Sequence, residues 1–128
     1  MQYLLDTNAI IRHFARLPNL GRKAKPNIEQ GENNEHRLFI SVISLMEIMY
    51  LAEKNRIPID FAETIQQLNF KTCYTIVDLN VDILSEATTV KFYELHDRLI
   101  IATAKHIGIP IISSDKKFKQ VEEIEVIW

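Results

Sequence analysis

The chain has 128 residues, of which 47% are hydrophobic and 25% charged, and its formal net charge is −2. This is an ordinary composition for a soluble globular protein with one core, so we expect a single domain over residues 1–128. No apolar run approaches the roughly 20 residues that span a bilayer, which argues against a membrane protein. The slightly acidic balance argues against a protein that binds nucleic acid through its overall charge.

The start of the chain and its cysteine content predict a compartment. The first residues, MQYLLDTN, have no basic leader before their apolar residues, and Asp6 interrupts them early. We therefore expect no signal peptide. The one cysteine, Cys73, cannot form an intramolecular disulfide. Without an export signal, we expect a cytoplasmic protein.

The hydrophobic pattern alternates between strand and helix along the whole chain. We expect strands at residues 2–6, 37–43, 73–79, 109–113 and 124–128, and helices at 8–17, 44–56, 59–70, most of 80–95 and 96–107. Residues 18–36 contain the helix-breaking Pro18 and Gly21 and predict a loop with a short helix inside it. Residues 114–121 predict a turn or a short helix. This alternation is typical of an α/β fold with a parallel sheet covered on both faces.

Two helix ends and two helix faces can be predicted in more detail. Asp60, with Glu63 three residues later, predicts a capped start for the helix at 59–70. Gly108 predicts the end of the helix at 96–107. The spacing of apolar residues predicts two buried faces: Leu45, Ile48, Met49 and Ala52 on one helix, and Leu99, Ile100, Thr103 and Ile107 on another.

Acidic residues stand where the predicted strands end or the following helices begin. Asp6 ends the first strand and Asp115 lies just past the fourth. Glu47 and Asp97 each lie in the first turn of a predicted helix. In a parallel sheet these positions share one edge, where ligands bind. The four acids can therefore face one cleft, as a divalent-metal site of hard oxygen ligands requires.

The same edge also collects helix caps and carboxylates that suit the positive end of a helix dipole. Asp6 could be a strand-end acid in an Asx turn with Asn8. A charge that follows buried residues is costly unless it is paired or liganded, however, which favours a functional role. Ser44 and Glu47 form the Ser-x-x-Glu pattern of a capping box, and this pattern alone favours a cap over a metal ligand.

The other two acids have alternatives as well. Asp97 could pair with the helix dipole or the neighbouring arginine, and its two interpretations are equally supported. Asp115 could be a turn residue, but the hydroxyls of Ser113 and Ser114 beside it could serve a metal site or a phosphate, which favours function. We expect His96 to be a cap or a hydrogen-bond partner, because oxygen-rich sites prefer Mg²⁺ or Mn²⁺ to imidazole-bound zinc.

The segments LLDTNAII, SVISLMEI, LHDRLIIATAK and IISSDKKF occur in this order and extend over most of the chain. Together they resemble the four acidic motifs of the PIN domain, in particular those of the VapC-like toxins of toxin–antitoxin systems. The resemblance implies a single PIN-like nuclease domain over residues 1–128. It also implies a three-layer α/β/α sandwich with a central, mostly parallel five-stranded sheet.

The resemblance further implies a Mg²⁺- or Mn²⁺-dependent endoribonuclease that hydrolyses RNA phosphodiester bonds. Such a toxin has a cognate antitoxin as its partner and forms a homodimer. The implied catalytic and metal-binding residues are Asp6, Glu47, Asp97 and Asp115. Ser113 and Asn8 are candidates for supporting these ligands, and the basic residues Arg12, Arg16, Lys116 and Lys117 are candidates for contacts with the RNA backbone.

Two other functions remain open from the sequence. One is a non-catalytic PIN-like module that binds RNA or a protein. The other is a phosphatase of the haloacid dehalogenase type, which also begins with a strand that ends in Asp but usually needs a second Asp where this chain has Asn8. An antitoxin could cover the helix around Met46, Met49 and Tyr50, although core packing is the favoured interpretation for Met49.

Overall fold

The structure is a computed structural model that describes residues 1–92 and 94–128. Its strands form one sheet in the order β3-β2-β1-β4-β5, and every neighbouring pair is parallel. The strands are β1 (Gln2–Leu5), β2 (Arg37–Ser41), β3 (Tyr74–Val77), β4 (Ile111–Ile112) and β5 (Val126–Ile127). The predicted five-stranded α/β fold is therefore confirmed, with strands shorter than the sequence pattern predicts.

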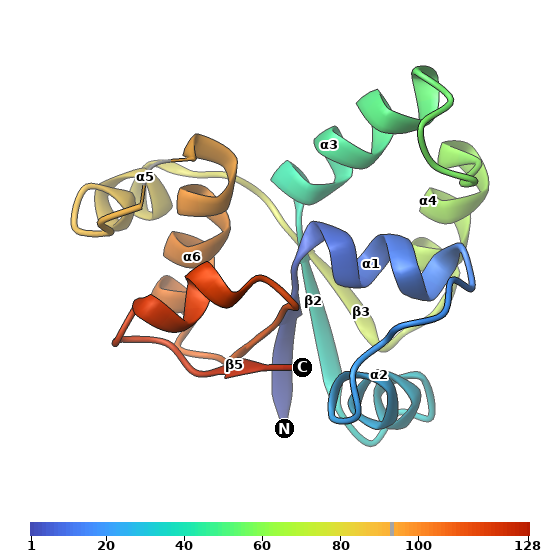
Figure 1. The fold of residues 1–128 in the computed structure, drawn as a ribbon, viewed down its shortest axis with the longest axis horizontal. Helices are drawn as coiled ribbons and strands as arrows, with labels where there is room; N and C mark the ends of the chain where they lie inside the picture. Colours follow the sequence, from blue (N-terminus) through green and yellow to red (C-terminus); the bar gives the residue numbers. More distant parts are fainter. Residues whose placement is uncertain (93) are drawn as a thin grey trace.

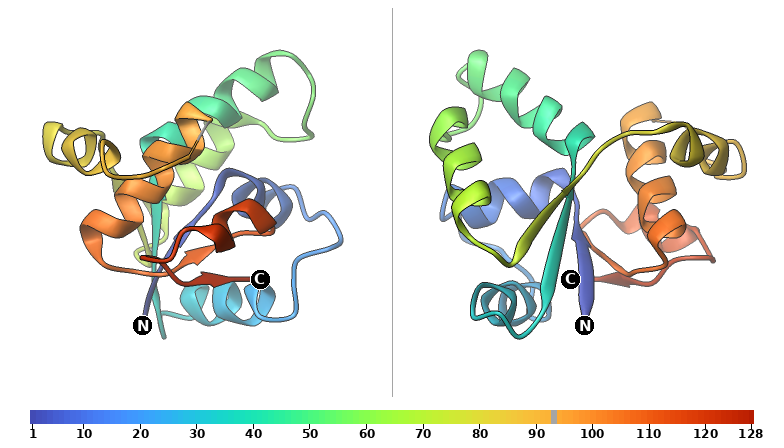
Figure 2. Two further views of the ribbon diagram at one scale, coloured as in Figure 1. Left: turned by 60° about the vertical axis from the view of Figure 1, so that its left-hand side comes forward. Right: turned by 180° about the vertical axis from the view of Figure 1, so that it is seen from behind.

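Helices cover both faces of the sheet, as Figures 1 and 2 show. They are α1 (Thr7–Phe14), α2 (Ala24–Glu32), α3 (Val42–Glu53), α4 (Phe61–Phe70), α5 (Val81–Ala87) and α6 (Leu95–Ile107), with a 3₁₀ helix η1 (Lys116–Gln120) after β4. Helices α1, α2 and α4 lie on one side, and α5 and α6 lie on the other. Within the described residues, no helix combines the length and apolar character needed to cross a bilayer.

Strand β1 is the centre of the core because its neighbouring side chains point to opposite faces. Leu5 packs in the hydrophobic cluster beneath α1, α2 and α4, where Ile10 and Ile28 are also buried. Leu4 packs in the second cluster, with Ile100 and Ile101 of α6. The chain visits β2 and β3 on one side of β1 and then crosses to β4 and β5 on the other. The carboxyl ends of β1 and β4 thus form the switch point at which α/β sheets bind ligands.

Helix α3 begins earlier than predicted. Ser41 is its N-cap, and the Ser41 Oγ accepts a hydrogen bond from the Ile43 backbone N–H at 3.1 Å. Ser44 lies inside the helix and is fully buried. The predicted capping box of Ser44 and Glu47 is therefore wrong, and Glu47 lies one turn further into α3 than expected. The apolar run 37–43 suggested a strand through residue 43, but its last two residues belong to α3. The pattern did not show this boundary, because an apolar residue such as Ile43 can be buried in a strand or in a helix.

Two more predicted helices are too long. Helix α1 ends at Phe14, and Arg16 just after it has a positive φ of 54°, so Leu17 lies outside the helix. In the segment 80–95, helix α5 covers only Val81–Ala87. The hydroxyls of Thr88 and Thr89 bind the carbonyls three residues earlier, which competes with continued helix. Residue 93 of this segment lies outside the described residues.

Three other local predictions are confirmed. Helix α2 is the short helix expected within residues 18–36. Asp60 caps α4 by accepting a hydrogen bond from the Glu63 N–H at 3.0 Å. Gly108 ends α6 with a φ of 79°, a left-handed conformation that glycine adopts without strain.

Candidate active site

Asp6 joins the end of β1 to the start of α1 and is only 4% exposed. Its Oδ1 accepts a hydrogen bond from the Ala9 N–H at 2.8 Å, which makes Asp6 the N-cap of α1. Its Oδ2 accepts a hydrogen bond from the Ser113 hydroxyl. Asn8 is exposed, and the side-chain bond of Asp6 goes to the Ala9 N–H rather than forming the alternative Asx turn with Asn8. Burial raises the pKa of Asp6 to about 6, even though both hydrogen bonds act to lower it.

The end of β4 supplies the next two side chains. The Ser113 Oγ, which donates to Asp6, accepts a hydrogen bond from the Asp115 N–H at 3.0 Å. Asp115 then caps η1, because its Oδ1 accepts from the Lys117 N–H at 2.9 Å. A continuous hydrogen-bonded chain thus runs from Asp115 through Ser113 to Asp6, across the carboxyl ends of β4 and β1.

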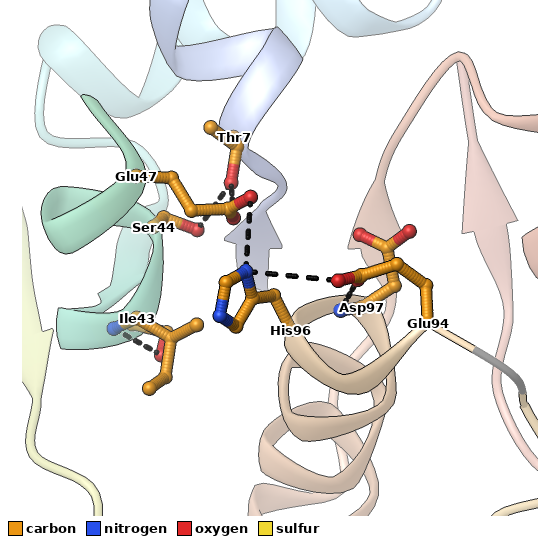
Figure 3. A network of polar contacts seen from close by, with 8 residues as sticks. Thr7, Ile43, Ser44, Glu47, Glu94, His96 and Asp97 are labelled. Carbon is orange, nitrogen blue, oxygen red and sulfur yellow. Dashed lines mark hydrogen bonds and ion pairs between the residues drawn. The ribbon is translucent and has the colours of Figure 1, made fainter. Parts of the chain in front are cut away.

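Glu47 projects from α3 toward the start of α1 (Figure 3). Its Oε1 lies 2.7 Å from the Thr7 Oγ1, and the same hydroxyl lies 3.0 Å from the Ser44 Oγ. Glu47 therefore has the role of a partner to α1 rather than of a cap within its own helix. The sequence pattern missed Thr7, since its only signal is that it directly follows Asp6.

Asp97 lies in the first turn of α6, as expected. Glu94 caps this helix by accepting a hydrogen bond from the Asp97 N–H at 2.6 Å. The pKa of Asp97 rises to about 6, first because of burial and then because of repulsion from Glu94, Glu47, Asp115 and Asp6. The charges of all three other predicted acids thus contribute to this shift, in line with their positions at the same edge of the sheet. Glu94 was missed because its sequence signal is only an acid three residues before Asp97.

His96 stands between two carboxylates of this cluster. Its Nδ1 lies 3.6 Å from the Glu47 Oε2 and 3.6 Å from the Glu94 Oε1 (Figure 3). These are ion-pair distances rather than hydrogen bonds. The imidazole is therefore an ion-pair neighbour of the acids, and the expectation that it is a cap or a hydrogen-bond partner is wrong, since Glu94 caps α6.

The donor chemistry of this edge fits a hard divalent cation. The facing groups are carboxylate oxygens, the ligands that Mg²⁺ and Mn²⁺ prefer. Burial, and then the charges of the neighbouring acids, raise the pKa of Asp97, and a bound cation would favour its ionised form. Among residues 1–92 and 94–128, however, no group of three or more His, Cys, Asp or Glu side chains is arranged to hold an ion. Asp6 and Asp115 instead direct oxygens to helix N-termini.

The predicted basic residues fall in two places. Lys116 and Lys117 are exposed in η1, directly after Asp115. Arg12 and Arg16 line a cavity of about 380 Å³ together with residues of α2 and α4. The Arg12 Nη1 donates to the Asn19 carbonyl at 2.9 Å, and its guanidinium lies 5.4 Å from the centre of the Trp128 ring. Only the first pair adjoins the acids directly in sequence.

An apolar groove lies beside the acidic edge, on the outer face of α3. Its volume is about 490 Å³, and its lining comprises Met46, Glu47, Met49, Tyr50, Leu51 and His96. Met49 is 38% exposed and Tyr50 52% exposed. The prediction that Met49 packs in the core is therefore wrong. Leu45 and Ile48 form the buried face, and no other element of the described chain covers the side chain of Met49 fully.

A family model of the PIN domain matches residues 3–124, and the chain therefore belongs to the PIN-domain family. PIN domains are generally nucleases, and such nucleases generally use divalent metals. The family that the four acidic motifs resemble is thus confirmed. No curated protein sequence matches the chain.

Solved structures with this fold include two VapBC structures and one toxin–antitoxin complex. VapBC2 from Rickettsia felis, bound to a promoter DNA fragment, contains a chain that is 20% identical, with a TM-score of 0.75 and coverage of 99% of this chain and 98% of that one. DNA-bound VapBC from Salmonella typhimurium gives 18% identity, a TM-score of 0.72 and coverage of 99% and 97%. A toxin–antitoxin complex from Klebsiella pneumoniae gives 24% identity, a TM-score of 0.66 and coverage of 98% of this chain and 96% of that one. At these identities the likeness establishes the fold.

Proposed function

We propose that this protein is a Mg²⁺- or Mn²⁺-dependent endoribonuclease and the toxin of a toxin–antitoxin pair. The observation that carries the proposal is that four acids stand along the carboxyl edge of the sheet, at the ends of β1 and β4, in α3 and in the first turn of α6. Burial, and then the charges of Glu94 and the other three acids, raise the pKa of Asp97 there to about 6. Membership of a family of nucleases supports the reaction class. The likeness in fold to chains of VapBC complexes supports the toxin assignment.

In this proposal, Asp6, Glu47, Asp97 and Asp115 hold one or two divalent ions. A bound ion supplies positive charge that keeps the carboxylates ionised, lowers the pKa of a water molecule and stabilises charge on the phosphodiester. Ser113 orients Asp6 and ties it to the Asp115 backbone. Asn8, exposed on the first turn of α1, has a more distant supporting role.

The basic residues bind the RNA backbone in this proposal. Lys116 and Lys117 follow Asp115 and are exposed to solvent, so their ammonium groups can reach phosphates beside the acids. Arg12 lies near the end of α1 and Arg16 just after it. In this proposal, both bind phosphates away from the scissile bond. Such contacts contribute affinity that falls as salt concentration rises, and they carry no sequence information by themselves.

The proposed partner is an antitoxin protein, as in the neighbouring structures named for VapBC. The apolar groove with Met46, Met49 and Tyr50 adjoins Glu47, so a peptide bound there would also cover the acidic edge. The proposal includes a homodimer, which size-exclusion chromatography with light scattering measures. It also includes a cytoplasmic location, since the buried Cys73 is a free thiol of the kind that reducing compartments maintain.

The function is tested by co-purifying the chain with the product of its neighbouring gene. The separated chain is then assayed on defined tRNA and rRNA fragments with Mg²⁺ or Mn²⁺. We expect internal cleavage that EDTA abolishes. RNA binding without cleavage in every metal would instead establish a non-catalytic module. EDTA-resistant turnover of small phosphomonoesters would point to a phosphatase.

A further inference from the structure

We infer that Thr7 is a positioning residue, which fixes the carboxylate of Glu47 for binding a divalent cation; this inference rests on the proposed nuclease function. Thr7 is the first residue of α1 and directly follows Asp6. The start of α1, at Asp6 and Thr7, would therefore orient two acids. Asp6 is held through its cap on α1, and Glu47 is held from a different helix through the Thr7 hydroxyl.

The direction of the hydrogen bonds follows from the chemistry of the three groups. The Thr7 Oγ1 lies 2.7 Å from the Glu47 Oε1 and 3.0 Å from the Ser44 Oγ. A hydroxyl has one proton to donate, and an ionised carboxylate can only accept. Thr7 therefore donates to Glu47 and accepts from Ser44. Bonds to an ionised acceptor are stronger than those between neutral groups.

Ser44 holds the Thr7 hydroxyl in the direction that serves Glu47. Ser44 is fully buried inside α3, and a buried hydroxyl needs a partner. Within the described residues, its side-chain partner is Thr7. Threonine also has a stiff side chain because it is branched at Cβ. The result is a rigid donor aimed at a carboxylate that would otherwise have several free torsions.

The second oxygen of Glu47 remains available at the site. The Glu47 Oε2 faces His96 of α6 at 3.6 Å, which is longer than a hydrogen bond (Figure 3). Asp97 follows His96 on the same helix. Thr7 thus holds one oxygen of Glu47 while the other lies on the side of α6. Partners that orient ligands in this way typically change metal affinity or activity about 10- to 100-fold when they are removed.

The alternative is that the Thr7–Glu47 bond only ties α1 to α3. Both roles predict some loss of stability in Thr7→Val, so stability does not separate them. Metal affinity does, because a tie between helices leaves the affinity of a folded protein for a cation unchanged. The control is Thr64→Val, since Thr64 is a helical threonine that is buried, where Thr7 is half-buried, and it donates only to the Asp60 carbonyl at the start of α4.

The test is Mn²⁺ binding to the full chain by isothermal titration calorimetry, with RNA cleavage measured on the same samples. We expect Thr7→Val to weaken Mn²⁺ affinity about 10- to 100-fold. Thr7→Ser restores the hydroxyl and is expected to stay within about threefold of wild type, and Thr64→Val is expected to match wild type. In a Glu47→Gln background, Thr7→Val is expected to have no further effect, because coupled residues are not additive.

The outcomes distinguish this inference from the function on which it rests. If wild type binds Mn²⁺ and cleaves RNA, and Thr7→Val has the same Mn²⁺ affinity, the role of Thr7 is overturned. The nuclease proposal then still stands. If Thr7→Val lowers Mn²⁺ affinity by the same factor in wild type and in the Glu47→Gln background, the role of Thr7 is also overturned. Wild type that neither binds Mn²⁺ nor cleaves RNA overturns both.

Discussion

Ser113 donates a hydrogen bond to the Oδ2 of Asp6 and so joins the carboxyl ends of β4 and β1. The two residues lie at opposite ends of the sequence, and both are almost fully buried. The same Ser113 oxygen accepts the Asp115 N–H. One hydroxyl therefore connects two of the acids across the switch point of the sheet.

Ser113→Ala is expected to lower the free energy of unfolding by about 1–3 kcal/mol, because it leaves a buried carboxylate and a backbone N–H short of a partner. It also removes a contact that lowers the pKa of Asp6, so that pKa is expected to rise further. Urea unfolding at pH 7 measures the first effect. The control is Ser114→Ala, at the less buried next position, which is expected to change stability by no more than about 0.5 kcal/mol. Equal effects of the two changes would count against the role of Ser113.

Asp97→Asn is expected to stabilise the metal-free protein at pH 7. The pKa of Asp97 is about 6 in the fold and 3.8 for an ordinary aspartate, so the fold disfavours its ionised form. This destabilisation is absent below about pH 4, where both states are protonated, and is complete above about pH 6. After a discount for solvent screening, we expect Asp97→Asn to raise the free energy of unfolding at pH 7 by about 1–2 kcal/mol.

The measurement is thermal unfolding of wild type and Asp97→Asn in EDTA at pH 4 and pH 7. The variant is expected to be the more stable protein at pH 7 and to lose most of that advantage at pH 4. Comparing the two proteins at each pH removes the effects of other titrating groups. A variant less stable than wild type at pH 7 would show that Asp97 is not held in a repulsive cluster.

Glu32 is expected to show the opposite pH dependence. Its hydrogen bond to His13 is the largest cause that lowers its pKa to about 2, and Lys71 adds to the effect. The stabilisation is therefore complete above the ordinary pKa of 4.5 and is lost as the pH falls toward 2. Glu32→Gln is expected to reduce stability by about 1–3 kcal/mol at pH 7 and by little near pH 2.

Urea unfolding of Glu32→Gln across this pH range measures the effect. Glu29→Gln, on an exposed position of the same helix, is the control and is expected to change little at any pH. A loss in Glu32→Gln that does not depend on pH would assign its effect to packing rather than to charge.

Met49→Ser is expected to weaken the binding of the proposed antitoxin about 5- to 30-fold, the scale of a buried apolar anchor. The reason is that Met49 lines the apolar groove beside Glu47 and is 38% exposed in the free chain. Phe70→Ser is the control, since Phe70 is 87% exposed and lies on α4, outside the groove. Titration of the co-purified partner onto each variant measures both. A larger loss for Phe70→Ser would place the interface elsewhere.

The alternation of strands and helices could be predicted because each element has its own hydrophobic period. Asp60 and Gly108 also carried clear local signals: Asp60 caps the start of α4 and Gly108 ends α6, as predicted. Element boundaries were harder where apolar residues continue from a strand into a helix, as at Ile43. A buried residue of this kind satisfies either period, and only the cap at Ser41 decides where α3 begins.

The candidate site could be predicted in its acids but less well in their partners. Asp6 and Asp97 follow from the shared edge of a parallel sheet. Thr7 could not be found in this way, because its contacts depend on how α1 and α3 meet in space. Glu94 was missed although its cap bond to Asp97 is local, because an acid three residues before another acid is a weak signal. Met49 was misplaced for a similar reason, since helical spacing does not show how far the neighbouring helices extend over a face.

The most direct test of the proposed site is cleavage of an RNA fragment by wild type and Asp97→Asn in Mn²⁺, with an EDTA control. Thermal unfolding confirms in the same experiment that the variant is folded. We expect wild type to cleave in Mn²⁺ and not in EDTA, and we expect Asp97→Asn to be slower by about 10²-fold or more. Cleavage by Asp97→Asn at the wild-type rate, or wild-type cleavage that persists in EDTA, would contradict a metal-dependent site built on these acids.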